Sequence, residues 1–322
     1  MTEPQPTIAV TRRTPGEIRV EGARTLILGD ACPTRDETLS FVRGASVIAS
    51  MFTDRIDAEL LDAAGPSLRG VCTFAVGHDN IDLDACRKRG VIVCSTPDAV
   101  TEGTANMAFL LLLAASRRLI EADRFARSDA YPAGGPLGMS DFMGQDLVGK
   151  LLLIVGAGRI GYATAIRARA FGMRIGYVAR TRHLEFEMAP LAGERFGLDD
   201  GLRAADAVSI HTPLTDETRG LLSRARVALL KPTAVVVNTA RGAVMDETAL
   251  AEALDAGRLW GLGLDVYENE PEVHPILRHH PRAVLTPHVG SAEQRWREAM
   301  SDMISANASA IISGREPPNR VI

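Results

Sequence analysis

Four polar residues that could perform acid–base chemistry follow short apolar segments in the second half of the chain. An arginine can donate two parallel hydrogen bonds to a carboxylate or a ketone, and a histidine can transfer a proton near neutral pH. A carboxylate beside the histidine favours its protonated form and orients the ring. The segments and the residues that follow them are Ala234–Val237 before Arg241, Gly261–Leu264 before Asp265 and Glu270, and Ala283–Leu285 before His288.

Each of these residues has a structural interpretation when it is taken alone. Arg241 could form a surface ion pair, Glu270 could be a loop carboxylate, and His288 could be a structural histidine. The apolar segments, with Ala207–Ile210 before His211 as a further one, are typical of strands in a parallel sheet. Because the carboxyl ends of such strands meet at one edge, where open α/β sheets bind ligands, this shared placement favours a catalytic group.

A glycine-rich stretch lies upstream of these residues. The apolar segment Leu151–Val155 predicts a buried strand, and Tyr162–Ala170 has helical spacing. Between them the sequence follows G-x-G-x-x-G, which in this context binds a dinucleotide. The first glycine permits the tight turn, the second lets the backbone approach the pyrophosphate, and the third lets helix and strand pack closely. The residues of this turn that we assign to the cofactor are Gly156, Gly158, Arg159, Ile160 and Gly161.

The choice between the two nicotinamide dinucleotides depends on the next expected strand, Arg174–Val178. Folds that prefer NAD place an acid about 20 residues after the glycines to bind the ribose 2′-hydroxyl. Here Arg180, Thr181 and Arg182 follow the strand, and no acid occurs before Glu185. Guanidinium groups and a hydroxyl suit a 2′-phosphate. We therefore predict that NADP(H) is preferred, with NAD(H) as the alternative cofactor. The alternative interpretation is that residues 180–182 are a solvated surface stretch with no role in binding.

The first hundred residues alternate short apolar segments with amphipathic stretches, which predicts a separate small α/β domain. Their most informative stretch runs from Phe74 to Asp82, where a strand ends at a glycine and a polar cluster follows. Exposed backbone N–H groups at this point could hold an anion. The alternative is an ordinary strand-to-helix turn, in which His78 is a loop residue.

Length and composition limit the classes to which the chain can belong. At 322 residues it predicts two domains. The chain is 46% hydrophobic, 24% charged and has a net charge of −4, so we expect no nucleic-acid partner. Its four cysteines lack C-x-x-C spacing, which favours reduced thiols over a metal site. The longest apolar run, Met107–Ala115, is about half the roughly 20 residues that cross a bilayer, so we expect a cytoplasmic protein that does not enter a membrane.

Six spaced motifs extend over the chain. They are VGHDNID (76–82), STPDAVTEGTA (95–105), VGAGRIG (155–161), NTARGAV (238–244), GLDVYENEP (263–271) and TPHVGSA (286–292). In these motifs the chain resembles the D-isomer-specific 2-hydroxyacid dehydrogenase family, and within it the glyoxylate and hydroxypyruvate reductases. Several motifs in a fixed order are far more specific than the glycines alone.

The resemblance implies an α/β fold of two Rossmann-like, flavodoxin-like parallel-sheet domains. An NAD(P)-binding Rossmann domain, residues 101–289, is expected to be inserted into a discontinuous substrate domain made of residues 1–100 and 290–322. A final helix over Ala292–Ser313 would complete the substrate domain. In this family the active site lies between the domains and the protein is a homodimer, for which the apolar helix at 104–116 could serve.

The resemblance also implies a function, the NADPH-dependent reduction of small 2-oxo acids such as glyoxylate or hydroxypyruvate to D-2-hydroxy acids. Arg241, Glu270 and His288 match the family's catalytic residues, with His288 protonating the alkoxide that develops as hydride arrives. The backbone of Val76 and Gly77 would hold the substrate carboxylate together with Arg241. Residues that the resemblance assigns to the cofactor, besides the glycine turn, are Thr104, Pro213, Thr239, Ala240, Asp265 and Gly290.

The sequence departs from the family at the substrate end. The loop that commonly carries tryptophans in glyoxylate reductases has Tyr131 instead, and His78 stands where a tyrosine or apolar residue is more usual. Hydroxypyruvate or a bulkier 2-oxo acid is therefore as compatible as glyoxylate. Two alternatives stay open: a family member acting on phosphite or formate, and a non-catalytic NAD(P)-sensing protein similar to the corepressors that share this fold.

Overall fold

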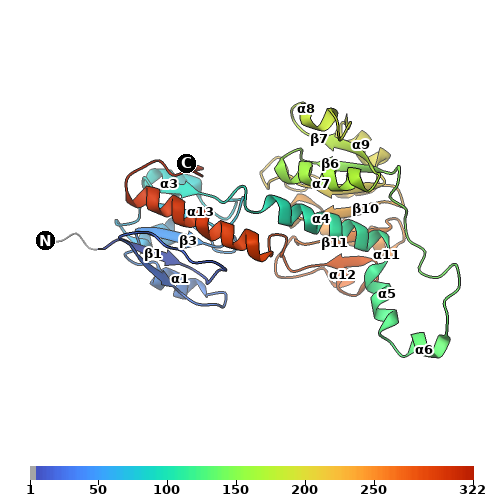
Figure 1. Ribbon diagram of the computed structural model, residues 1–322, viewed down its shortest axis with the longest axis horizontal. Helices are drawn as coiled ribbons and strands as arrows, with labels where there is room; N and C mark the ends of the chain where they lie inside the picture. The colour runs from blue at the N-terminus through green and yellow to red at the C-terminus, as the bar shows by residue number, and fades with distance from the viewer. Residues whose placement is uncertain (1–4) are drawn as a thin grey trace. The chain divides into compact units, whose positions relative to one another are not determined.

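The computed structural model describes residues 5–322, which divide into two units (Figure 1). One unit contains the chain up to Val100 together with Ser291–Ile322, and the other is the continuous segment Thr101–Gly290. Each unit is built on a sheet of its own. Within residues 5–322, no helix combines the length and the apolar character that crossing a membrane requires.

The discontinuous unit contains a five-stranded parallel sheet in the order β2-β1-β3-β4-β5. Its strands are β1 (Thr7–Val10), β2 (Arg24–Ile27), β3 (Val47–Ser50), β4 (Gly70–Thr73) and β5 (Ile92–Cys94). Its helices are α1 (Arg35–Phe41), α2 (Ala58–Ala64), α3 (Leu83–Lys88) and α13 (Gln294–Ile312). Strands β3 and β4 are buried along their whole length, as expected when both faces of a parallel sheet are covered.

The short helices of this unit begin at residues whose side chains satisfy the first backbone N–H groups. Thr34 and Glu37 form a capping box at the start of α1. Asp57 and Asp82 each accept a backbone N–H at the starts of α2 and α3. These caps fix where each helix begins after its strand.

Helix α13 completes this unit from the far end of the chain and lies against β3 and β4 (Figure 1). A Cβ on Gly70 would come within 2.6 Å of Ile311 Cδ1, so the glycine lets the helix pack closely on β4. After the helix, Val321 donates its backbone N–H to the carbonyl oxygen of Val93 at 2.7 Å. The end of the chain thereby pairs with the edge of the sheet at β5.

The continuous unit contains a seven-stranded parallel sheet in the order β12-β11-β10-β9-β6-β7-β8. Its strands are β6 (Leu151–Val155), β7 (Arg174–Val178), β8 (Glu194–Arg195), β9 (Ala207–Ile210), β10 (Val235–Asn238), β11 (Gly261–Leu264) and β12 (Ala283–Leu285). Its helices are α4 (Thr101–Ser116), α5 (Leu119–Ala126), α6 (Ala130–Gly134), α7 (Arg159–Ala170), α8 (Leu184–Glu187), α9 (Leu198–Ala204), α10 (Arg224–Val227), α11 (Glu247–Asp255), α12 (Pro275–His279) and the 3-10 turn η1 (Gly242–Val244).

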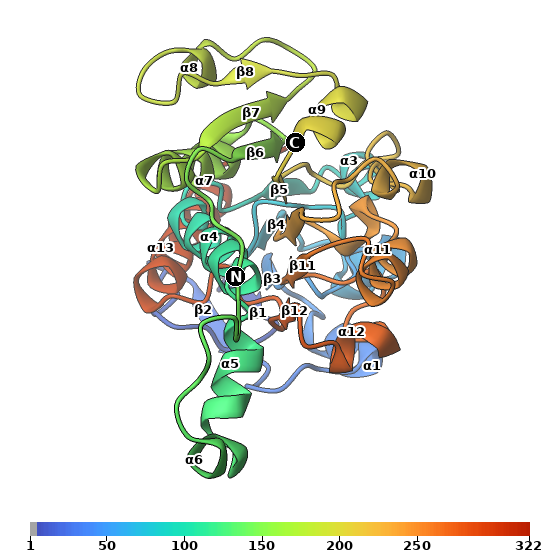
Figure 2. The same cartoon turned by 90° about the vertical axis from the view of Figure 1, so that its right-hand side faces the viewer.

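Helices cover both faces of this second sheet, and β6 shows how its core is divided. Leu152 and Ile154 pack in the cluster that contains residues of α4 and α7, whereas Leu153 and Val155 pack in the cluster that contains residues of α9 and α11. Alternate residues of one strand point to opposite faces, so a run of five apolar residues serves both clusters. Helices α5 and α6 project away from the sheet (Figure 2).

The predicted fold class is confirmed, because both sheets are parallel throughout and are flanked by helices. The apolar runs that predict strands in the sequence occupy strands in the structure. The run Thr101–Ser116, apolar nearly all round, forms α4 and packs on β10 and β11.

Candidate active site

Three neighbouring strands bring the candidate catalytic residues to one edge of the sheet in the Thr101–Gly290 unit. Strands β10, β11 and β12 lie side by side and run parallel. Arg241 follows β10, Glu270 follows β11, and His288 follows β12. The three residues thus follow neighbouring strands at one edge of the sheet, as the sequence pattern predicts. Their chemical roles stay a prediction.

Glu270 and His288 form a hydrogen-bonded pair. The Oε2 atom of Glu270 lies 2.8 Å from Nδ1 of His288, and its Oε1 atom accepts the backbone N–H of Tyr267 at 3.2 Å. Both side chains are partly exposed, 29% for Glu270 and 22% for His288. Because the carboxylate meets Nδ1, the ring nitrogen on the opposite side, Nε2, is the one able to exchange a proton with a substrate.

The loop that carries His288 is held by the buried carboxylate of Asp265. Its two oxygens accept the backbone N–H groups of Val289 at 2.8 Å and Gly290 at 2.7 Å, and the hydroxyl of Thr286 donates to it at 2.6 Å. His288 has a backbone φ of +55°, which residues other than glycine seldom adopt. Asp265 therefore stabilises the backbone conformation that presents His288 at the strand end.

Arg241 lies at the start of η1 in a loop that is shaped by the buried side chain of Asn238. The amide nitrogen of Asn238 donates to the carbonyl oxygen of Arg241 at 2.9 Å, and its amide oxygen accepts the N–H of Ala240 at 2.9 Å. A Cβ on Gly242 would lie 1.9 Å from the carbonyl carbon of Tyr267. Only glycine fits next to Arg241, because the loop after β11 passes directly against it.

The glycine-rich turn between β6 and α7 has the shape of a phosphate cradle. Gly156 has a φ of +104°, and a Cβ on it would lie 2.7 Å from the backbone of His211, at the end of the neighbouring strand β9. A Cβ on Gly161 would lie 2.3 Å from the carbonyl oxygen of Gly156. Gly158 faces open space, and no side chain caps α7 at this end. The first N–H groups of α7 can therefore donate to a bound pyrophosphate, so the turn fits a dinucleotide.

Two buried hydroxyl groups next to this turn also fit a polar ligand. Thr212 Oγ1 after β9 and Thr239 Oγ1 after β10 are buried and have no hydrogen-bond partner among the described residues. Buried hydroxyls normally have a partner, so these two atoms indicate where a ligand or a water binds. Thr104 on α4 lies next to Gly290, because a Cβ on Gly290 would come within 3.5 Å of the Thr104 side chain.

The remaining residues predicted for the cofactor differ in their exposure. Pro213 is exposed beyond β9, Ala240 is half-buried beside Arg241, and Arg159 is exposed at the first turn of α7. Ile160 is half-buried in the same turn. The predicted cofactor residues follow β6, β7, β9, β10, β11 and β12, and Thr104 lies on α4.

The residues after β7 form an exposed basic patch. Arg180 is exposed, and its guanidinium lies 4.0 Å from the Glu217 carboxylate. Arg182 donates from Nε to Glu187 at 2.7 Å, so its charge is already paired. Arg195 on β8 donates to the carbonyl oxygens of Ala179 and Arg180, at 3.0 Å each. Arg195, which sequence reasoning missed, joins the patch through strand pairing rather than through sequence proximity.

His211, which follows β9, is uncharged near neutral pH. Its Nε2 atom lies 2.8 Å from the hydroxyl of Ser209. Although part of the residue stays accessible, burial of the imidazole lowers the pKa of His211 to about 3. The backbone of His211 lies against Gly156, and its uncharged ring brings no positive charge to this strand end.

In the discontinuous unit, Val76 and Gly77 follow β4 in an exposed loop. The loop is anchored by Asn80, whose side-chain amide donates to the carbonyl oxygens of Met51 at 3.2 Å and Asp54 at 2.7 Å. His78 Nδ1 is buried and has no hydrogen-bond partner within residues 5–322. Whether this loop binds a carboxylate stays a prediction.

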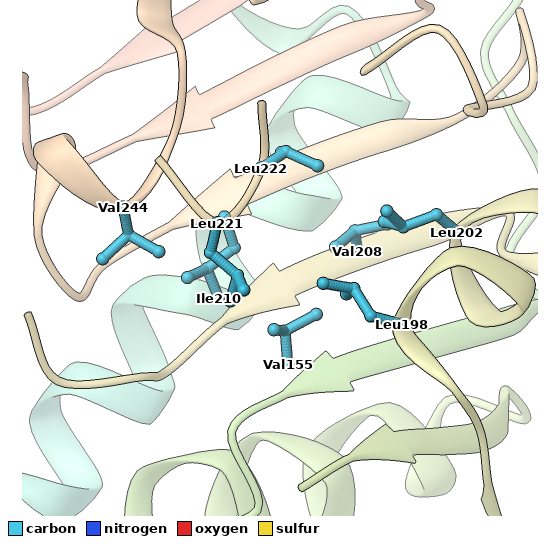
Figure 3. Close-up of a pocket in the computed structure, with 8 residues that line it drawn as sticks. All are labelled: Val155, Leu198, Leu202, Val208, Ile210, Leu221, Leu222 and Val244. Carbon is cyan, nitrogen blue, oxygen red and sulfur yellow. The ribbon is translucent and has the colours of Figure 1, made fainter. Parts of the chain in front are cut away.

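A small apolar void lies in the core of the Thr101–Gly290 unit, among side chains of β6, β9 and α9 (Figure 3). Its volume is about 10 Å³, which is too small for any group of a cofactor, and it offers a water no polar partner. The void is a packing feature. It is lined by Val155, Leu198, Leu202, Val208, Ile210, Leu221, Leu222 and Val244.

The glycine cradle and the Arg241, Glu270 and His288 strand ends together define an NAD(P)-dependent α/β oxidoreductase. The family model described as the NAD-binding domain of D-isomer specific 2-hydroxyacid dehydrogenase matches residues 109–290. The chain belongs to the D-isomer specific 2-hydroxyacid dehydrogenase family. The resemblance found in the sequence motifs is confirmed.

Curated relatives and solved structures agree with this assignment. The chain is 46% identical to the glyoxylate reductase of Thermococcus onnurineus over 89% of this chain and 86% of that protein. A Thermus thermophilus structure aligns with a TM-score of 0.91 at 42% identity, covering 98% of this chain and 100% of the other. The NADPH-dependent glyoxylate/hydroxypyruvate reductase of Sinorhizobium meliloti, in complex with NADP and malonate, aligns with a TM-score of 0.83 at 33% identity, covering 99% and 97%.

Proposed function

We propose that the chain is an NADPH-preferring reductase of small 2-oxo acids, of the glyoxylate or hydroxypyruvate type, that yields D-2-hydroxy acids. The observation that carries this proposal is the hydrogen bond between Glu270 and His288, which follow the paired strands β11 and β12. Arg241 follows β10, the strand on the other side of β11. An acid–base histidine and a carboxylate-binding arginine are the two groups that reduction of a 2-oxo acid requires. The glyoxylate reductase relatives support the substrate class.

In the proposed mechanism Arg241 binds the substrate and His288 supplies a proton. The guanidinium of Arg241 donates to the carboxylate and ketone oxygens and orients the ketone. A bound reduced nicotinamide supplies the hydride to C2. His288 Nε2 then protonates the ketone oxygen as negative charge develops on it. Glu270, which is hydrogen-bonded to Nδ1, keeps the ring oriented for the transfer.

We propose that the Thr101–Gly290 unit binds the cofactor and that the discontinuous unit binds the substrate carboxylate. In the second unit, backbone N–H groups at Val76 and Gly77 would donate to the carboxylate. In the first, Thr104 and Asp265 would line the nicotinamide end, while the glycine turn holds the pyrophosphate. Reduced cysteines buried in the discontinuous unit, at positions 72, 86 and 94, support a cytoplasmic location.

The NADPH preference rests on the basic patch after β7. The sequence has no acid between the end of β7 and Glu185, where folds that prefer NAD bind the ribose 2′-hydroxyl, and Arg180 is more exposed than Arg182. Arg195 fixes the backbone of residues 179 and 180 and brings a further positive charge. A 2′-phosphate would therefore meet Arg180 and Thr181 first, and Arg182 only if its bond to Glu187 yields.

We also propose that the protein is a homodimer. Helix α4 exposes Leu110, and the projecting segment after it exposes Leu119, Tyr131, Leu137 and Met139. Apolar side chains gathered on a projecting segment are typical of a protein–protein interface. Light scattering of the purified protein gives its mass in solution, and a monomer at micromolar concentration contradicts this part of the proposal.

A substrate panel tests the proposed reaction. NADPH oxidation is followed by absorbance with glyoxylate, hydroxypyruvate, pyruvate and phenylpyruvate, and is repeated with NADH. We expect turnover of at least one 2-oxo acid and a higher kcat/KM for NADPH. Activity confined to phosphite or formate with NADP⁺, or a partner that binds only with NADPH in the absence of any turnover, contradicts the proposal. A higher kcat/KM for NADH contradicts the cofactor preference alone.

A further inference from the structure

Glu247 is a buried carboxylate that the proposed mechanism does not use. It is the first residue of α11, and only 5% of its surface is exposed. Its Oε2 accepts the backbone N–H of Glu268 at 2.7 Å, and its Oε1 accepts the backbone N–H of His274 at 3.0 Å. Both oxygens of one carboxylate thus bind the loop between β11 and α12, on either side of Glu270.

The start of α11 is itself fixed, so Glu247 is a firm anchor. The side chain of Asp246 caps the helix by accepting the N–H of Ala249 at 2.7 Å. A negative charge in the first turn of a helix is stabilised by the helix dipole, which offsets part of the cost of burying Glu247. Glu247 therefore holds the loop to a rigid element rather than to another loop.

The same loop is also in contact with the segment that carries Arg241. Gly242 lies so close to Tyr267 that no side chain fits between them, because a Cβ on the glycine would be 1.9 Å from the Tyr267 carbonyl carbon. Five residues after Gly242, Glu247 binds the loop a second time. The two contacts join the β10 strand end to the loop after β11 at both ends of the segment 242–247.

We propose that Glu247 is a positioning residue. It holds the loop after β11 so that Glu270 reaches Nδ1 of His288 and so that Arg241 keeps its position relative to these two residues. This inference rests on the proposed function. The charged groups around His288 are Glu270 on its ring and Asp265 on the backbone that follows it, and Arg241 follows β10, the strand on the other side of β11. Tyr267 lies among the carboxylates, and burial together with the charges of Asp265, Glu247 and Glu270 raises its pKa well above the ordinary value.

Three variants separate positioning from stability. Glu247→Ala removes both hydrogen bonds to the loop, and Glu247→Gln removes the charge while its one amide oxygen retains one bond. Glu252→Ala is the matched control, because Glu252 lies on the same helix and pairs on the surface with Arg224. The readouts are kcat with the best 2-oxo acid, NADPH affinity by fluorescence, and the NMR signal of the hydrogen-bonded proton between His288 Nδ1 and Glu270 in the free protein.

We expect Glu247→Ala to lower kcat by up to roughly 10²-fold, the effect of a misplacement of about 1 Å. NADPH affinity stays at the wild-type value, and the NMR signal of the hydrogen-bonded proton between His288 and Glu270 moves upfield or is lost, because Glu270 no longer reaches the ring. Glu247→Gln gives an intermediate result, and Glu252→Ala gives none. In the Glu270→Ala background, Glu247→Ala adds no further loss, because the two residues act through one contact.

Other outcomes overturn the inference. A Glu247→Ala protein that is less stable but keeps the wild-type kcat and the wild-type signal of the His288–Glu270 proton makes Glu247 a structural residue only. A loss of that signal in Glu247→Gln as complete as in Glu247→Ala shows that the charge of Glu247 acts rather than its position. If the wild type reduces no 2-oxo acid, the proposed function fails, whereas this NMR signal in the free protein still decides the role of Glu247.

Discussion

Glu270 binds His288 through the ring nitrogen Nδ1 at 2.8 Å and is itself held by the backbone N–H of Tyr267. The carboxylate therefore fixes the orientation of the imidazole without occupying Nε2. A histidine at a φ of +55° is held in place by Asp265 from the backbone side and by Glu270 from the ring side. Asp265 and Glu270 both belong to the loop after β11, and they hold the backbone after His288 and its ring, respectively.

Replacing His288 by alanine should remove the proton donor and leave the cofactor site intact. We expect His288→Ala to lower turnover by roughly 10²–10⁴-fold, the usual contribution of a general acid. NADPH affinity, measured by fluorescence titration, should stay at the wild-type value because the glycine cradle lies at β6 and α7. Near-normal turnover in this variant would remove His288 from the mechanism.

The glycines of the cradle should respond to a methyl group in opposite ways. Gly158 faces open space, so Gly158→Ala should leave the free energy of unfolding within about 0.5 kcal/mol and weaken NADPH binding by roughly tenfold or more. Gly161→Ala places a Cβ 2.3 Å from the Gly156 carbonyl oxygen and should destabilise the fold by about 1–3 kcal/mol. Urea unfolding and NADPH titration measure both; equal loss of stability in the two variants contradicts the assignment.

Arg180 should contribute to the choice of cofactor. A lost charge-assisted hydrogen bond is worth about 1.5–3 kcal/mol, so Arg180→Ala should lower kcat/KM for NADPH by roughly 10–100-fold and leave NADH unaffected. Arg182→Ala is the comparison, and its effect should be smaller because Arg182 is bound to Glu187. Steady-state kinetics with both cofactors measure the ratio. An equal loss with NADH and NADPH would mean that Arg180 does not contact a 2′-phosphate.

His211 should make the stability of the protein depend on pH. Burial lowers the folded-state pKa to about 3, below the value of about 6.5 in the unfolded chain, so the unfolded chain binds the proton first. The stabilisation is complete above about pH 6.5 and falls by up to about 1.4 kcal/mol per pH unit between that pH and about pH 3. Urea unfolding of wild type and His211→Gln is measured at pH 5, 6, 7 and 8. The contribution of His211 is the difference between the two proteins in how steeply the free energy of unfolding changes with pH. Parallel curves contradict the prediction.

The sequence allows the strand ends to be predicted because the signals there are local. Runs such as Leu151–Val155 are too short and too apolar for anything but a buried strand, and each catalytic candidate follows such a run. The parallel sheets and the adjacency of Arg241, Glu270 and His288 follow from that pattern. The family motifs add the assignment of roles, which local patterns do not contain.

Interactions between distant segments could not be predicted in the same way. The bonds from Glu247 to Glu268 and His274, and from Arg195 to Ala179, depend on how strands and loops meet in space. The neutrality of His211 depends on burial that no single segment determines. The bond between Arg182 and Glu187 spans five residues, and their opposite charges are the one signal in the sequence that could have revealed it.

The position of α13 has a consequence for synthesis on the ribosome. The sheet of the discontinuous unit packs against α13 through Gly70 and Ile311, so its core is complete only after Gln294–Ile312 has been synthesised. The Thr101–Gly290 unit is continuous and can complete its sheet earlier. We therefore expect the unit that begins second to complete its fold first. Until α13 has been synthesised, the sheet face that it covers stays exposed, which makes β3 and β4 open to non-native contacts in the nascent chain.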